Sequence, residues 1–87
     1  MSTIVCLINI FDLKQTVMVC NDEDEIRITQ ECNLGEVPEV AVNMANEYDT
    51  TKVILHGNQN YAGELSAQML SMNPELNIEI MSKGEKF

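Results

Sequence analysis

The sequence predicts an α/β protein in which five short strands form one mixed sheet and two helices pack against it. The first observation behind this prediction is the order of elements, because five apolar runs and two segments of helical periodicity follow one another as β-β-β-α-β-α-β. The second is composition, since 45% hydrophobic residues with only two Pro and four Gly are typical of a folded chain. We expect a single small domain over residues 1–87, with residues 82–87 as a flexible tail.

The first three strands are predicted to form an antiparallel meander. Residues 3–11, TIVCLINIF, are apolar except for Thr3 and Asn9, which is typical of a strand buried on both faces. The connection DLKQ leads to a strand at residues 16–20, and the acidic connection NDEDE leads to another at residues 26–32. Asn9 would then be a polar amide inside a central strand, where it needs either a hydrogen-bonding neighbour or a functional role.

The first helix is expected to begin near Pro38 and to run to about Tyr48. Proline suits the first turn of a helix because the N–H that it lacks has no partner there. Apolar residues recur three and four positions apart and predict one buried stripe, made of Val37, Val40, Ala41, Met44, Ala45 and Tyr48. A short apolar strand, TKVIL, follows at residues 51–55.

The second helix is predicted over residues 61–72, with Asn60 as its N-cap. Its buried side is expected to carry Ala62, Leu65, Met69 and Met72. Pro74 ends the helix, because the residue before a proline avoids helical geometry. Residues 76–81 then alternate apolar and polar side chains, which predicts a half-exposed strand.

The connections between strands predict the arrangement of the sheet. The most economical sheet has the apolar first strand in its centre, in the order 3-2-1-4-5, with only the second strand antiparallel. The last two strands each follow a helical crossover, and such crossovers are almost always right-handed. Because both crossovers run in the same direction, both helices should lie on one face. The other face of an apolar sheet would stay uncovered, so we expect a homodimer or another protein partner there.

The net charge and the cysteines indicate which partners and which cellular compartment to expect. Fourteen acidic and five basic residues give a net charge of −9, which makes direct nucleic-acid binding unlikely because the chain repels phosphates. Cys6, Cys20 and Cys32 are an odd number without the CxxC spacing of zinc sites, so we predict reduced thiols in a cytoplasmic protein. No segment has the length of a membrane span or the pattern of a signal peptide, so no membrane association is predicted.

This order of elements and strands is similar to that of the ribonuclease H-like fold, over about residues 3–81. A ferredoxin-like or other small α/β sandwich is the alternative. For nucleases, the resemblance implies carboxylates on the first strand and at the ends of later strands, where they hold two Mg²⁺ ions. Asn9 best matches the first of these positions, and Asp12 is the second choice. The fourth strand ends in VILHGN without an acid, so nuclease catalysis is not predicted.

The loop HGNQNYAG, residues 56–63, is the strongest candidate for a ligand site. Ligands of open α/β sheets lie beyond the carboxyl ends of parallel strands, and the end of the first strand should lie beside this loop. A ligand would then meet Asn9, Asp12, His56, Asn58 and Asn60. The loop lacks the pattern of a phosphate-binding loop, and a Gly-Asn turn before a capped helix is ordinary connecting structure. Both interpretations, ligand site and plain turn, therefore stay open.

We predict a small acidic, non-enzymatic protein-interaction module, of the kind that phages and mobile elements encode. No catalytic residue, metal site or cofactor is predicted. The alternative is a ligand-binding or degenerate nuclease-like domain that uses the five polar residues at the ends of the first and fourth strands. The two predictions differ in whether polar side chains from these strands converge on one place.

Overall fold

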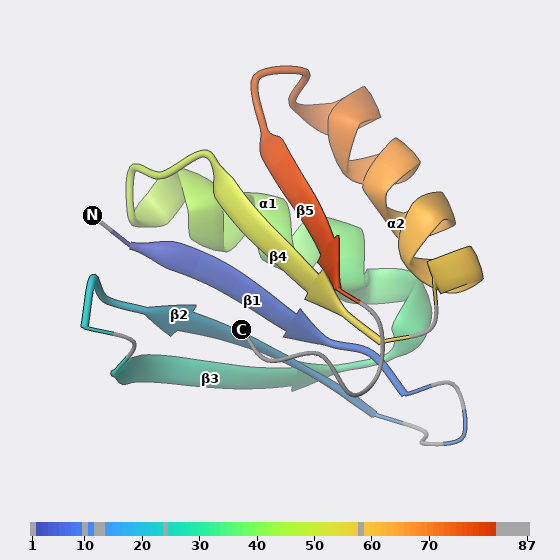
Figure 1. Cartoon of the computed structure of the whole chain (residues 1–87), viewed down its shortest axis with the longest axis horizontal. Coiled ribbons are helices and arrows are strands. Elements are labelled where there is room, and N and C mark those ends of the chain that lie inside the picture. The colour runs from blue at the N-terminus through green and yellow to red at the C-terminus, as the bar shows by residue number, and fades with distance from the viewer. Residues whose placement is uncertain (1, 10, 12–13, 24, 58, 82–87) are drawn as a thin grey trace.

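A mixed five-stranded sheet forms the centre of the protein in a computed structural model that describes residues 2–9, 11, 14–23, 25–57 and 59–81 (Figure 1). Its elements are β1 (Thr3–Leu7), β2 (Gln15–Cys20), β3 (Ile26–Cys32), a short 3-10 helix (Leu34–Glu36), α1 (Val37–Glu47), β4 (Lys52–His56), α2 (Gln59–Met72) and β5 (Asn77–Met81). The strand order is β3-β2-β1-β4-β5, which confirms the prediction. β2 is antiparallel to β1 and β3, whereas β4 is parallel to β1 and β5 is parallel to β4.

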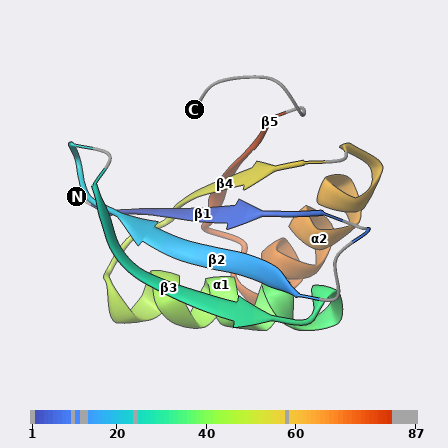
Figure 2. The ribbon, with the colours of Figure 1, turned by 90° about the horizontal axis from the view of Figure 1, so that it is seen from below.

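Both helices cover the same face of the sheet, as the edge-on view in Figure 2 shows. This is the arrangement expected when two right-handed crossovers run in one direction, from β3 to β4 and from β4 to β5. The main core lies between this face and the helices, and Ile4, Val17, Leu55 and Met69 are fully buried in it. We call this side of the sheet the helix face and the other side the open face.

The two helices bury most of the residues that were predicted to face the core. In α1 these are Val37, Ala41, Met44 and Ala45, and in α2 they are Ala62, Leu65 and Met69. The prediction for Met72 is wrong, because its side chain is 53% exposed. The amide N of Leu76 donates a hydrogen bond to the carbonyl O of Asn73 at 3.2 Å. This turn after α2 brings Leu76 back into the main core, where its side chain is buried. In the described part of the chain, no helix is long and apolar enough to cross a membrane.

The first strand is shorter than predicted. β1 ends at Leu7, and Phe11, which was expected in the same strand, is 89% exposed. β2 and β4 each begin or end one residue from the predicted position, and α2 begins at Gln59, two residues before its predicted start. The predicted flexible tail, residues 82–87, lies outside the described residues.

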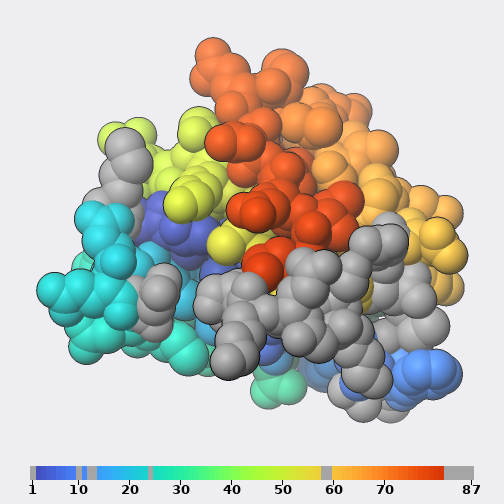
Figure 3. Space-filling view, in the orientation of Figure 1, coloured from blue at the N-terminus to red at the C-terminus, as the bar shows by residue number. Residues whose placement is uncertain are grey.

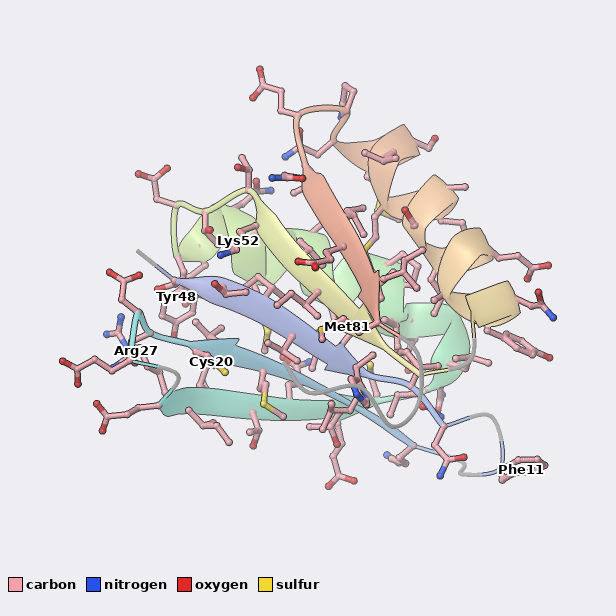
Figure 4. The ribbon with its side chains drawn as sticks, in the orientation of Figure 1. Phe11, Cys20, Arg27, Tyr48, Lys52 and Met81 are labelled. Atoms are coloured by element: carbon pink, nitrogen blue, oxygen red, sulfur yellow. The ribbon has the colours of Figure 1, made fainter. Side chains whose placement is uncertain are left out.

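A β-bulge interrupts the regular pairing of β2 with β3. Val19 pairs with Ile28, but Cys20 pairs with Ile26, so Arg27 is an extra residue on β3. A bulge changes the alternation of side chains between the two faces of a strand. Here the Arg27 guanidinium carbon lies 5.6 Å from the centroid of the Tyr48 ring, at the end of α1 (Figure 4). The bulge therefore gives Arg27 an aromatic partner on the helix side of the sheet.

Candidate functional site

The carboxyl ends of β1 and β4 lie side by side, as predicted. Leu7 pairs with His56, and the amide N of Ile8 lies 2.9 Å from the carbonyl O of His56. Gly57 follows with a φ of 153°, and a Cβ at this position would collide with the carbonyl O of Ile8. Only glycine combines this backbone conformation with so close an approach. The glycine of the HGN turn therefore has a structural role between the two strands.

Asn9 does not lie inside a strand, which corrects the prediction. It follows the end of β1 and its side chain is exposed. Its side-chain Oδ1 accepts a hydrogen bond from the amide N of Phe11 at 3.0 Å, which is an Asx turn. A polar residue that makes such a turn ends a strand, and this explains why β1 stops before residue 9. Asn9 is thus a turn residue and not a buried amide.

The buried amide of this region belongs to Gln15, which the sequence analysis did not single out. Gln15 is 2% exposed, and its Nε2 donates to the carbonyl O of Asn9 at 2.8 Å. Its Oε1 accepts from the amide N of Asn9 at 2.5 Å. The two bonds hold the two ends of the β1–β2 connection together, just beyond the last paired residues of β1 and β2. Alternation could have revealed this residue, since Gln15, Val17 and Val19 occupy the same face of β2.

The structure describes two of the four remaining predicted site residues, His56 and Asn60. The prediction that Asn60 caps α2 is wrong, because α2 already begins at Gln59 and Asn60 is an exposed residue of its first turn. Asp12 and Asn58 lie outside the described residues. His56 is half-buried at the end of β4, on the open face of the sheet. The carboxyl ends of β1 and β4 therefore lie together as predicted, but the side chain of Asn9 makes a turn there.

The acidic connection between β2 and β3 is organised by Asn21. The Oδ1 atom of Asn21 accepts hydrogen bonds from the amide N atoms of Glu23 and Glu25, each at 2.9 Å. The amide N of Asn21 also lies 2.9 Å from the carbonyl O of Glu25. The side chains of Asp22, Glu23 and Glu25 are exposed. At these three positions the acidic run is therefore a solvated turn.

All three cysteines are free and buried, which is consistent with the prediction of reduced thiols. Burial, together with the neighbouring Cys32, raises the pKa of Cys6 to about 12. Burial also raises the pKa of Cys32, and the nearby Glu36 adds to this effect while Lys14 opposes it. Both thiols are therefore protonated near neutral pH, and a protonated thiol is a poor nucleophile. Among the described residues, no group of His, Cys, Asp and Glu is placed to hold a metal ion.

The open face has a regular arrangement that follows from the strand registers. Paired residues of neighbouring strands lie in one row and point to the same side. The rows, from β3 to β5, are Ile26, Cys20, Thr3, Lys52 and Asn77; then Thr29, Met18, Val5, Ile54 and Glu79; then Glu31, Thr16, Leu7, His56 and Met81. Figure 3 looks onto this face, with the red atoms of β5 above and the cyan turn between β2 and β3 at the left. Figure 4 labels Cys20, Lys52 and Met81, which come from three different strands of it.

An apolar cluster occupies the centre of the open face. Val5, Met18 and Cys20 form it, and Leu7 and Ile54 pack against it. The first three are only 2–6% exposed in the single chain, so the centre is less accessible than an uncovered sheet was expected to be. They lie on the inner strands β1 and β2, where cross-strand neighbours surround each side chain. The accessible part of this face is its border, where Ile26 is 59% exposed.

Comparison with known proteins adds no relative to this description. No protein-family model matches the chain, and a search of curated proteins found no match.

Proposed function

We propose that this protein is a small acidic protein-interaction module without enzymatic activity, which binds through the open face of its sheet. The observation that carries the proposal is the apolar cluster of that face, which extends from β2 to β4 although both helices lie on the other side. Protein interfaces combine an apolar centre with a polar border. The open face has this composition, since Lys52, Glu79 and Glu31 surround the cluster on β4, β5 and β3.

The occupant of the open face is a second copy of the chain or another protein, in a reducing cytoplasmic compartment. The net charge of −9 supports a protein occupant over a nucleic acid, because binding to phosphates depends on releasing counterions to basic residues. The three free thiols support a reducing compartment.

The absence of catalysis is proposed because the polar groups at the strand ends serve the fold. The side chain of Asn9 bonds the amide N of Phe11, and its backbone bonds Gln15. Protonated, buried Cys6 and Cys32 are unsuited to nucleophilic attack. These contacts support a structural role for the polar residues, while the open face offers the surface for binding.

Substitution of the border of the apolar cluster tests the proposal. Leu7→Ser with Ile54→Ser makes the open face polar at two half-buried positions, and Leu70→Ser on α2 is the control, since Leu70 is 39% exposed on another surface. Light scattering at micromolar concentration measures association. We expect a mass above 9.8 kDa for the wild type, loss of association in the double variant, and no change in the control. Association that is equally unaffected in both variants would contradict the use of this face.

A second candidate function is a ligand-binding or degenerate nuclease-like domain, in keeping with the ribonuclease H-like order of strands. The contact between the amide N of Ile8 and the carbonyl O of His56 favours it, because it brings the two strand ends to one place. Titration with Mg²⁺, Mn²⁺ and nucleotides, followed by amide chemical shifts, tests this candidate. Shifts clustered at Asn9, Asp12, His56, Asn58 and Asn60 would favour it over the interaction module, and unchanged spectra would count against it.

A further inference from the structure

The edge strand β3 is accessible along almost its whole length. It is one of the two outermost strands of the sheet, and among the described strands it pairs only with β2 (Figure 1). Every residue from Ile26 to Glu31 is exposed, and the exposed fractions of Ile26 and Ile28 are 59% and 45%. Ile28 pairs with Val19 of the main core, so it points to the helix face but is not covered there. β3 therefore offers both of its faces and its outer side to a partner.

The outer side of β3 presents backbone groups that no described strand pairs with. Alternate residues of an edge strand direct their N–H and C=O groups away from the sheet, which makes the edge a template for one more strand. Proteins protect such an edge with a proline, a lysine, a short strand or a bulge. β3 is the longest described strand, with seven residues, and its sequence IRITQEC holds no Pro and no Lys. The bulge at Arg27 lies near its start, so residues 28–32 remain regular and open to pairing.

Acidic side chains lie at both ends of this edge. Glu25 directly precedes β3 and Glu31 is its next-to-last residue, and both side chains are exposed. Among the described basic residues, Arg27 lies against the Tyr48 ring, and Lys14 precedes β2, one strand further into the sheet. An incoming strand therefore meets a negative edge, on a chain whose net charge is −9.

We infer that β3 binds an extended, basic segment of another protein, which adds to the sheet as a further antiparallel strand. This surface is separate from the open face, so the inference goes beyond the proposed function. Main-chain hydrogen bonds supply affinity in this mode of recognition, and the side chains of alternate residues supply specificity. The negative edge favours a basic partner, because charge complementarity selects partners and excludes like-charged ones.

A second copy of the chain fits this edge less well than a basic segment. Antiparallel pairing of two β3 strands brings Glu25 of each copy near Glu31 of the other, and like charges across a strand pair are unfavourable. Arg27 does not balance this repulsion, because it is directed to Tyr48 on the helix side. Glu31 pairs with Thr16 and lies on the open face.

The side chains of β3 specify the pattern of the segment. Residues opposite each other in an antiparallel pair point to the same face. The segment residue opposite Glu31 lies on the open face and should be basic. The residue opposite Ile28 comes three positions later, lies on the helix face and should be apolar and β-branched. A second basic residue, three positions further, reaches the acidic turn that precedes β3.

A synthetic peptide of sequence KTTVTTK tests the inference. Fluorescence anisotropy of the labelled peptide measures binding to the full chain, and amide chemical shifts of the protein locate it. We expect saturable binding with shifts concentrated in residues 26–32, and binding of ETTVTTE weaker on the order of tenfold or more. N-methylation of the third and fourth peptide residues, one of which directs its N–H to β3 in either pairing, should weaken binding to a similar extent. Equal binding of the three peptides, or no binding of KTTVTTK, would overturn the inference.

Two isoleucines on the two edge strands provide matched protein variants. Ile80 on β5 is 38% exposed and pairs with Leu55 of the main core, so it points to the helix face as Ile28 does. Ile28→Lys should abolish binding of KTTVTTK, and Ile80→Lys should change it by less than about twofold. If Ile28→Lys does not fold, Glu31→Lys replaces it, with Glu39→Lys on α1 as its control. Binding that is lost in Ile80→Lys and kept in the β3 variants would overturn the assignment to β3.

The open-face variants distinguish this inference from the proposed function. Leu7→Ser with Ile54→Ser should bind KTTVTTK as the wild type does, because neither residue lies on β3. Peptide binding that survives in this double variant supports the edge, whether or not self-association is lost. Self-association that Ile28→Lys abolishes and the double variant retains would make a second copy the occupant of β3 and overturn the basic segment.

Discussion

The two faces of the sheet are both apolar at their centres, but they differ in what surrounds the apolar residues. On the helix face, Ile4, Val17 and Leu55 have no exposed surface, and helices cover them. On the open face, a cluster of three buried residues has polar and charged side chains at its border. The helices bury the helix face, whereas on the open face the border of the cluster is the accessible part. Neighbouring residues of one strand should therefore respond differently to the same substitution.

The largest difference is expected between Leu55 and Ile54, which are adjacent in β4 and point to opposite faces. Leu55→Ala removes a fully buried side chain from the main core and should lower the free energy of unfolding by about 2–5 kcal/mol. Ile54→Ala affects a half-buried side chain and should cost less than about 1.5 kcal/mol. Urea unfolding of the two variants, each followed by circular dichroism, measures the difference. Equal losses would show that the open face contributes to stability as the helix face does.

The thiol of Cys6 gives the helix face a dependence on alkaline pH. Burial, with a smaller contribution from Cys32, raises the pKa of Cys6 from 9.0 to about 12. The fold favours the neutral thiol, so its contribution is fully present below pH 9 and is lost as the pH rises from 9 towards 12. The loss should be about 1.4 kcal/mol for each pH unit in this window. The urea midpoint measured from pH 8 to about pH 10.5 should fall less in Cys6→Ala than in wild type, and parallel curves would contradict the prediction.

Gln15 is a deeply buried polar side chain of the helix face, and its removal should have an intermediate effect. Gln15→Ala leaves the N–H and carbonyl of Asn9 without their side-chain partner and should cost about 1–3 kcal/mol. Asn9→Ala keeps both of these backbone bonds and loses the bond to Phe11, so it should cost less than about 1 kcal/mol. Thermal unfolding of the pair checks this order. A reversed order would mean that the side chain of Asn9, and not its backbone, holds the connection.

The smallest effect is expected at the border between the two faces, where the bulge directs Arg27 to Tyr48. Arg27→Ala removes a cation–π contact at a partly exposed site and should cost about 0.5–1 kcal/mol. Tyr48→Leu, which keeps an apolar side chain against the core, should make the same Arg27 substitution nearly neutral. A double-mutant cycle by urea unfolding measures the coupling. Additive effects of the two substitutions would show that the contact contributes nothing.

Most of the fold follows from local patterns and from one rule of handedness. Periodicity located the five strands and two helices. The apolar first strand, placed in the centre of the most economical sheet, predicted the strand order, and right-handed crossovers predicted the shared helix face. The end of β1 was not predictable in this way, because the apolar run continues through Phe11 while an Asx turn at Asn9 ends the strand. The bulge was also hidden, since Arg27 between Ile26 and Ile28 fits a regular alternation. The Asx turn is a local bond over two residues, whereas the bulge depends on the pairing of β3 with β2.

In the candidate site, too, some features could be predicted from the sequence and others could not. The meeting of the strand ends at Ile8 and His56 was predicted because parallel strands share one edge of a sheet. The role of Asn60 was predicted wrongly, since a helix start shifted by two residues turns a cap into an interior position. Gln15 was missed because its importance depends on a partner six residues earlier, in a connection that has no regular structure.

The pairing of β1 with β4 has a consequence for how the chain folds. Ile4 pairs with Val53, so the central parallel contact joins residues 49 positions apart, whereas the two hairpins of the meander join near neighbours. Contacts between distant residues form late, because closing a long loop costs more chain entropy. During synthesis, the hairpins emerge before any residue of β4, and their apolar side chains have no cover at that stage. We expect the nascent chain to reach its fold only after β4 and α2 have left the ribosome, and until then to depend on its acidic residues for solubility.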